Sequence, residues 1–180
     1  MKKIVLGLLM AVSFFSKAQE ASLPIDETTK LISYNEVVTV NNSTSKDELF
    51  SRAKSCFAYL FKSSKSVIQN EDKDSGIIIG KGNIKAYAKA LGIDFEGGFV
   101  NFTITIACKD GRYKYVITNF FHEGTGSKMP SGGNLENEIV RTWTNRQWKT
   151  MKSQTDTEIK NLASLIKSEM SKPTPQNDKW

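Results

Sequence analysis

The stretch "FVNFTITIACKDGRYKYVITNFF", residues 99–121, decides the fold because it predicts two antiparallel strands joined by a tight turn. Asp110 and Gly111 form the dipeptide that favours a two-residue hairpin turn. On each side of this turn apolar and polar residues alternate, as expected of strands with one buried face. The predicted core positions are Val100, Phe102, Ile104, Ile106 and Cys108 in the first strand and Tyr113, Tyr115, Ile117 and Phe121 in the second.

A second hairpin is predicted upstream, in "NEDKDSGIIIGKGNI", residues 70–84. Apolar β-branched runs flank its polar cluster, and Gly76 can take the positive φ that such a turn needs. The spacing does not fit a calcium loop, because Ser75 stands in the glycine position and Lys81 in that of the closing glutamate. Only three residues separate Gly76 from Gly80, one fewer than a phosphate loop requires. The stretch therefore predicts a turn and no metal site.

Two helices are predicted from capping-box spacing, one starting with Ser45 and Glu48 and the other with Thr155 and Glu158. After each signal, apolar residues recur with the period of a helix that packs on one side. The first predicted stripe is Leu49, Ala53, Cys56, Phe57 and Leu60, and the second is Ile159, Leu162, Ala163, Ile166 and Met170.

The remaining segments complete the predicted order of elements. Residues 31–40 alternate like a strand, whereas residues 123–134 have turn composition and predict a loop. Between the hairpins, "AYAKAL" fits either a strand or a short helix, and "GIDFEGG" predicts a turn. The order is strand, helix, four strands, helix. It indicates an α+β fold with a single antiparallel sheet of about five strands and the helices packed on one face. We expect one domain over residues 19–172 and a polar tail at 173–180.

The N-terminal sequence "MKKIVLGLLMAVSFFSKAQ" predicts a secretory signal peptide over residues 1–18. Its apolar run, from Ile4 to Phe15, is shorter than the roughly 20 residues that span a bilayer. The mature chain is therefore expected to be exported, to the periplasm or to the cell surface and exterior, without a membrane span. Three lysines leave with the signal, so 25 basic residues become 22 against 19 acidic ones, and the net charge falls from +6 to +3.

Few side chains are available for metal binding or nucleophilic chemistry. Cys56 and Cys108 are the only cysteines, and His122 is the only histidine. A four-ligand zinc site of Cys and His therefore cannot be assembled, and no cofactor is expected. Export favours disulfides, but both cysteines fall on predicted core faces, so we predict two buried, unpaired thiols.

The segment "RTWTNRQWK" alternates Trp143 and Trp148 with Arg141 and Arg146. Aromatic rings and guanidinium groups can stack on sugars, nucleic-acid bases or a partner protein. These four residues, together with His122 at the end of the last predicted strand, form the predicted binding site. In the alternative interpretation, which burial statistics favour, the tryptophan rings dock the segment onto the domain and His122 is a surface residue.

Several stretches together resemble a known family. "LPIDETTKLISYNEVVTV", "SKDELFSRAKSCFAYLF" and "SVIQNEDKDSGIIIGKGNI" precede, in this order, a strand pair that ends in "YKYVITNF". In this combination the chain is similar to an exported bacterial family of unknown function described as having a TATA-binding-protein-like (TBP-like) fold. The resemblance covers about residues 23–121. It implies a TBP-like arrangement of sheet and helices, and it implies no catalytic residues, because none is established for the family.

The predicted function is a non-enzymatic binding or assembly module of the cell envelope, with an envelope protein or a glycan as partner. A carrier of a small apolar ligand in a cavity between sheet and helices is an alternative. A small hydrolase based on His122 is less favoured, because no G-x-S-x-G nucleophile elbow is present. The modest charge of the mature chain and its even distribution argue against a nucleic-acid partner.

Overall fold

The computed structural model describes residues 23–61, 67–90, 93–126 and 129–173. The elements are β1 (Ser33–Thr39), α1 (Lys46–Leu60), β2 (Ile68–Asp72), β3 (Ile77–Ala90), β4 (Ile93–Lys109), β5 (Arg112–Glu123), β6 (Gly133–Asn134) and α3 (Asn145–Ser171). The predicted α+β class and order of elements are confirmed, with one strand more than expected. This additional strand, β6, lies within residues 123–134, for which the sequence predicts a loop.

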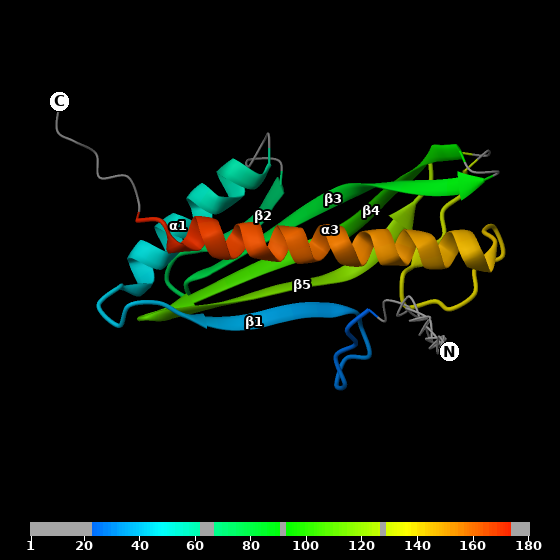
Figure 1. Ribbon diagram of the computed structural model, residues 1–180. Helices are drawn as coiled ribbons and strands as arrows, with labels where there is room; N and C mark the ends of the chain where they lie inside the picture. The colour runs from blue at the N-terminus through cyan, green and yellow to red at the C-terminus, as the bar shows by residue number, and fades with distance from the viewer. Residues whose placement is uncertain (1–22, 62–66, 91–92, 127–128, 174–180) are drawn as a thin grey trace, which may run out of the picture.

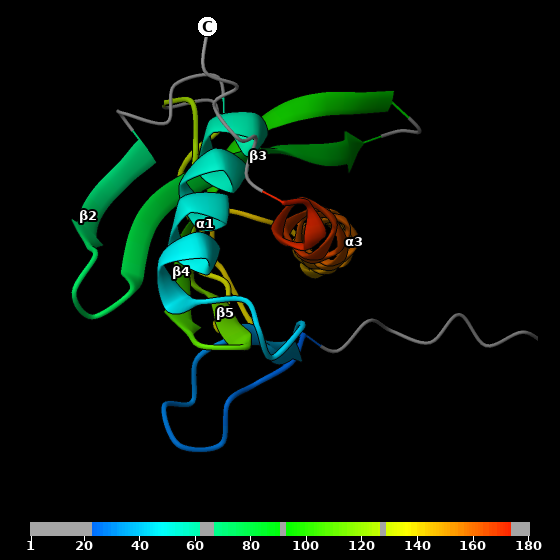
Figure 2. The same cartoon turned by 90° about the vertical axis from the view of Figure 1, so that its left-hand side faces the viewer.

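The strands form one six-stranded antiparallel sheet in the order β1-β5-β4-β3-β2, with β6 paired to the end of β5. Figure 1 shows α3 extending along the sheet, with α1 packed beside its C-terminal half. Figure 2, viewed almost along α3, shows both helices on the same side of the sheet. Within the described residues, the opposite face carries no helix.

The core lies between the sheet and the two helices. The predicted inward positions of β4 and the first three of β5 are all buried, as are four of the five positions in each helical stripe. Leu60 and Leu162, the fifth positions, are partly buried against the same cluster. The two periods that the sequence displays, two in strands and about 3.6 in helices, therefore predict the core correctly at these positions.

The turn in "NEDKDSG" is a hairpin turn, as predicted. Asp72 pairs with Ile77, and its Oδ1 accepts hydrogen bonds from the backbone N–H groups of Asp74 (3.0 Å) and Ser75 (3.2 Å). Gly76 has a φ of 72°. The carboxylate of Asp72 thus stabilises its own turn.

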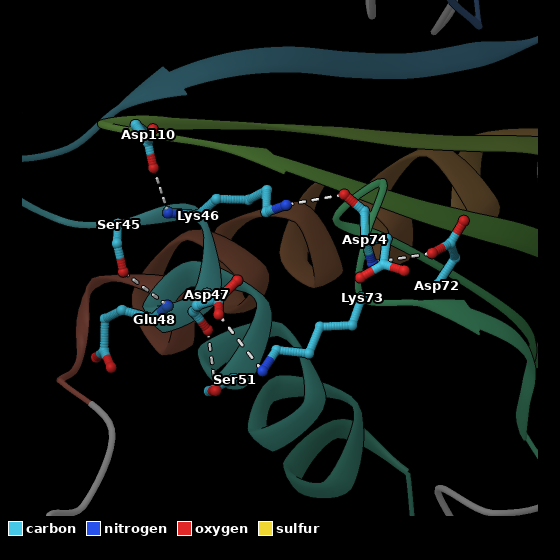
Figure 3. Close-up of polar contacts among 9 residues, drawn as sticks. All are labelled: Ser45, Lys46, Asp47, Glu48, Ser51, Asp72, Lys73, Asp74 and Asp110. Carbon is cyan, nitrogen blue, oxygen red and sulfur yellow. Dashed lines mark hydrogen bonds and ion pairs between the residues drawn. The ribbon is translucent and has the colours of Figure 1, made fainter.

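The start of α1 is joined to both hairpin turns through Lys46 (Figure 3). Its backbone N–H donates to Oδ1 of Asp110 (2.7 Å), and its Nζ donates to the carbonyl of Asp74 (2.8 Å). The Ser45 side chain caps the helix by accepting from the N–H of Glu48 at 3.2 Å. Polar residues here connect the helix to the sheet.

The strands β3 and β4 continue beyond the predicted turn. The predicted turn over "GIDFEGG" is wrong, because β3 reaches Ala90 and β4 already begins at Ile93. A register shift opposite Ala86 and Tyr87 marks a β-bulge in β4. At this bulge Gly98 has a φ of 106°, and a Cβ there would overlap the carbonyl oxygen of Glu123.

A second β-bulge, in β5, changes which side chains near the end of this strand face the core. The pairing steps from Thr103 with Thr118 to Asn101 with Phe121, so β5 carries one extra residue. Asn119 occupies this position with a φ of 59°. The prediction that Phe121 lies in the core is therefore wrong: it is 43% exposed, whereas Phe120 and His122 are buried.

The last helix begins ten residues before the predicted start at Thr155. Thr144 is the N-cap and forms a reciprocal capping box with Gln147. Trp143, just before the cap, packs on Trp148 with ring centroids 6.4 Å apart, in the positions of a hydrophobic staple. Thr155 is buried inside the helix. The predicted start is wrong because a second Thr-x-x-Gln signal lies upstream, supported by tertiary packing.

Three of the predicted features lie partly or wholly outside the described residues. These are the signal peptide at 1–18, the N-terminal end of the domain at 19–22, and the tail at 173–180 beyond Pro173. Over the residues that the structure does describe, neither helix is both long and apolar enough to span a membrane.

We predict that Gly76 cannot be replaced by alanine without loss of stability. A Cβ there would lie 2.7 Å from the carbonyl oxygen of Cys108, in a left-handed backbone. Gly133 has a similar φ of 80°, but its nearest neighbour, Nδ2 of Asn137, would be 3.6 Å away. Gly133→Ala should cost about 1 kcal/mol from strain alone. Gly76→Ala should cost at least about 1 kcal/mol more, because of overpacking. Urea unfolding measures both, and equal losses would contradict the prediction.

Candidate functional site

The five residues of the predicted binding site separate into a buried and an exposed group. His122, Trp143 and Trp148 are buried, whereas Arg141 and Arg146 are exposed. The ring of His122 meets those of Trp143 and Trp148 edge to face, with centroids 4.9 and 6.0 Å apart. The structure thus brings three of the five together, in what we call the histidine–tryptophan cluster.

His122 is fully buried, so its interpretation as a surface residue is wrong. The N–H of Gly132 donates to its Nδ1 (2.9 Å), which therefore carries no proton. The protonated Nε2 donates to the carbonyl of Gly97 at 2.7 Å. Burial lowers the pKa of the imidazole. His122 is thus a neutral ring with both nitrogens bonded to the backbone.

The two indole rings hold the segment that precedes α3. Nε1 of Trp148 donates to the carbonyl of Asn137 (2.7 Å), and Nε1 of Trp143 donates to that of Pro130 (3.2 Å). A buried indole N–H needs such a partner, and here both partners come from the segment 130–137. The tryptophan rings therefore dock this segment onto the domain, as in the alternative interpretation.

Two glycines allow the backbone to approach these rings. A Cβ on Gly97 would lie 2.9 Å from the Trp143 ring, and one on Gly132 would overlap the Trp148 ring. The close fit leaves no face of Trp148 open to a ligand, since 1% of this residue is exposed. Binding through the exposed Arg141 and Arg146 stays a prediction.

His122 and the thiols do not form a catalytic pair. His122 pairs with Val100, eight residues before Cys108 on β4, which corresponds to about 27 Å along a strand. Both cysteines are free and buried, and burial raises the pKa of the Cys56 and Cys108 thiols to about 12. At neutral pH both thiols are therefore protonated and are poor nucleophiles.

A groove of about 350 Å³ lies between β1 and α3. Its lining consists of Pro24, Ser33, Tyr34, Asn35, Tyr115, Lys160, Ala163, Ser164 and Lys167. The Tyr34 hydroxyl donates to Oδ1 of Asp156 (2.8 Å), while the Tyr115 hydroxyl and Nζ of Lys167 both donate to Oε2 of Glu36 (3.0 Å). These polar groups are paired within the protein. The sequence suggests a cavity between sheet and helices as an alternative, but it does not indicate these lining residues, because they come from distant segments.

The face of the sheet opposite the helices carries a row of three aromatic side chains. We define the aromatic row as Tyr87 on β3, Phe99 on β4 and Phe121 on β5. Tyr87 and Phe121 are 42% and 43% exposed, and Phe99 is half-buried. Phe99 pairs with Lys85 and Glu123, so Tyr87 and Phe121 are its diagonal neighbours on either side. On the β5 side the ladder is regular, and such diagonal neighbours are about 7–8 Å apart. The alternation in the sequence does not predict this row, because it assigns Phe121 to the core.

The antiparallel sheet with α1 and α3 on one face defines a TBP-like α+β protein. The chain belongs to the family described as a domain of unknown function (DUF4468) with TBP-like fold, whose model matches residues 34–123. The resemblance predicted from the sequence is thereby confirmed. The matched residues contain β1 to β5 and α1, together with the aromatic row and His122.

Two crystal structures share the fold. A TBP-like protein from Parabacteroides distasonis is 15% identical and superposes with a TM-score of 0.64, covering 84% of this chain and 99% of that one. A DUF4468 family protein from Bacteroides ovatus is 12% identical, with a TM-score of 0.59 and coverage of 84% and 93%. No curated protein matches the chain. At these identities the likeness concerns the fold alone.

We predict that His122 makes the stability of the fold depend on pH. Its folded pKa lies below the unfolded value of about 6.5, so the unfolded chain binds the proton first as pH falls. Stability is fully present above about pH 6.5 and is lost below it, by up to about 1.4 kcal/mol per pH unit. His122→Gln should flatten this slope between about pH 5 and 7, as measured by urea unfolding at each pH. An unchanged slope would contradict the assignment of a buried neutral ring.

We predict that both thiols are free but protected by the fold. A thiol reagent applied to the native protein at pH 8 should modify Cys56 and Cys108 slowly, because burial raises the pKa of each thiol to about 12. After unfolding without reductant, mass spectrometry should find both modified. Protection of both in the unfolded chain would reveal a disulfide, and rapid labelling of the native protein would show that they are accessible.

Proposed function

We propose that the protein is an exported, non-enzymatic binding or assembly module of the cell envelope, with the helix-free face of its sheet as the contact surface. The observation that carries this proposal is the aromatic row: two of its three large aromatic side chains stand more than 40% exposed on rigid strands. Clusters of exposed aromatic side chains are characteristic of interaction sites. The partner is an envelope protein or a glycan.

The location in the envelope follows from the N-terminal sequence. Its basic start, its apolar run and its small-residue exit favour cleavage after Ala18 and release of the chain into the periplasm or to the cell surface. The mature chain keeps only a modest net charge after removal of the signal peptide, so it carries no strong electrostatic field of one sign. This is consistent with binding to an envelope protein or a glycan.

The burial of His122 argues against the hydrolase alternative. A general base must reach the substrate directly or through one water, but both nitrogens of His122 are bonded to backbone groups and the ring is 0% exposed. The groove between β1 and α3 does not favour an apolar ligand, because lysine, serine, asparagine and tyrosine groups form much of its lining. The face of the sheet is therefore the better candidate.

We predict that the mature protein sediments with isolated envelope fragments of the organism that expresses it. Replacing two members of the aromatic row, in Tyr87→Ala/Phe121→Ala, should weaken this association at least tenfold, or about 1.4 kcal/mol. Tyr59→Ala is the matched control, because Tyr59 is a tyrosine that is 64% exposed but lies on α1. Sedimentation assays over a concentration series measure the affinity. No association of the wild type, or equal association of the double variant, would refute the proposal.

A further inference from the structure

We infer that the aromatic row binds a neutral glycan chain by stacking on the apolar faces of its sugar rings. This inference rests on the proposed function and names its ligand class. It is carried by the placement of the three rings, the polar groups beside them and the local balance of charge.

The β-bulge in β5 places Phe121 on the helix-free face, beside Tyr87 and Phe99. Without the extra residue at Asn119, the alternation of β5 would turn Phe121 into the core. Tyr87 already lies on this face through the unbroken alternation of β3, and the bulge in β4 shifts the register so that Tyr87 pairs with Glu96. Bulges commonly re-aim side chains at functional sites. The sheet thus holds outward two rings, Tyr87 and Phe121, that a soluble protein would more often bury.

The three residues lie on a diagonal across the central strands of the sheet. Phe121 lies level with Asn101 on β4, Phe99 is two residues further along, and Tyr87 lies opposite Glu96, beyond the bulge. In the undisturbed ladder between Phe99 and Phe121 this diagonal spacing is about 7–8 Å. A chain of rings laid along this diagonal can contact all three side chains at once, while the paired strands keep their spacing fixed.

Amide and carboxylate groups border the row and can bond sugar hydroxyls. Asn83 and Asn101 face each other across β3 and β4, and Nδ2 of Asn101 donates to Oε2 of Glu123 at 2.9 Å. Nζ of Lys85 lies 3.5 Å from Oε2 of Glu96. Each hydroxyl of a sugar both donates and accepts, which matches a mixed border of amides, carboxylates and an ammonium group.

The local charge favours a neutral ligand over a nucleic acid. Among the side chains that the structure describes near the row, the positive charges of Lys81 and Lys85 are balanced by Glu96 and Glu123. Binding to single-stranded nucleic acid needs a positive track for the phosphates as well as stacking rings. The other cations on this face of β4 and β5, Lys109, Arg112 and Lys114, lie near the turn at Asp110 and Gly111, at the far end of β5 from Phe121.

The test uses envelope fragments treated in three ways. One sample is digested with protease, one with nuclease, and one is oxidised with periodate, which opens sugar rings that carry neighbouring hydroxyls. We expect the mature protein to bind the protease-treated and nuclease-treated fragments as it binds untreated ones, and to lose at least tenfold in affinity for the oxidised fragments. Binding should persist in 0.5 M NaCl, because no phosphate is contacted.

Variants connect this result to the aromatic row. Tyr87→Ala and Phe121→Ala should each weaken binding at least tenfold, whereas Tyr87→Phe, which keeps the ring, and Tyr59→Ala should bind like the wild type. Because the replaced side chains are exposed, melting temperatures should remain within a few degrees and confirm folding.

The outcomes separate this inference from the proposed function. If binding is lost after protease but survives periodate, the ligand is a protein: the glycan inference is overturned and the binding module stands. If binding is lost after nuclease and falls steeply with salt, the ligand is a nucleic acid, and the inference is also overturned. If the wild type binds no fragment at all, the proposed function fails and this inference fails with it.

Discussion

The bulge in β5 is the constraint on which the end of the sheet around His122 depends, because it sets which side chains of this strand face the core. A single extra residue at Asn119, in a left-handed conformation, reverses which side chains face the core. Phe120 and His122 turn inward, and Phe121 turns outward. The buried position of His122 and the exposed position of Phe121 therefore follow from one bulge. A strand has a side-chain period of two, so the insertion of one residue exchanges its faces.

The inward-turned His122 then organises segments that are distant in sequence. Its two nitrogens bond the backbone at Gly97 on β4 and at Gly132 before β6, and its ring packs against the tryptophans that open α3. A neutral imidazole can satisfy one donor and one acceptor at once, which few other side chains can do in an apolar setting. The only histidine of the chain is thus explained by structure, without a catalytic role.

The packing of both helices on one face of the sheet leaves the other face outside the core. Helices α1 and α3 cover the face that forms the core, so the opposite face is free to vary with little effect on folding. Crystal structures that are 12–15% identical retain the fold with TM-scores of 0.59 and 0.64. A shared fold does not transfer a function, so the proposed binding depends on the exposed residues of this chain.

The amino-acid sequence by itself determined the two hairpins, the helix that starts after Ser45, the inward positions of β4 and the family, because these depend on turn chemistry and short-range periodicity. The bulge at Asn119 and the strand β6 were decided only by the tertiary structure. The start of α3 at Asn145 has a local signal, the capping box of Thr144 and Gln147, which the packing of Trp143 on Trp148 supports. His122 and the tryptophans of the histidine–tryptophan cluster are more than 20 residues apart, so their packing leaves no local pattern. The aromatic row was hidden for the same reason: its members come from three strands, and the register between strands is set by contacts across the sheet.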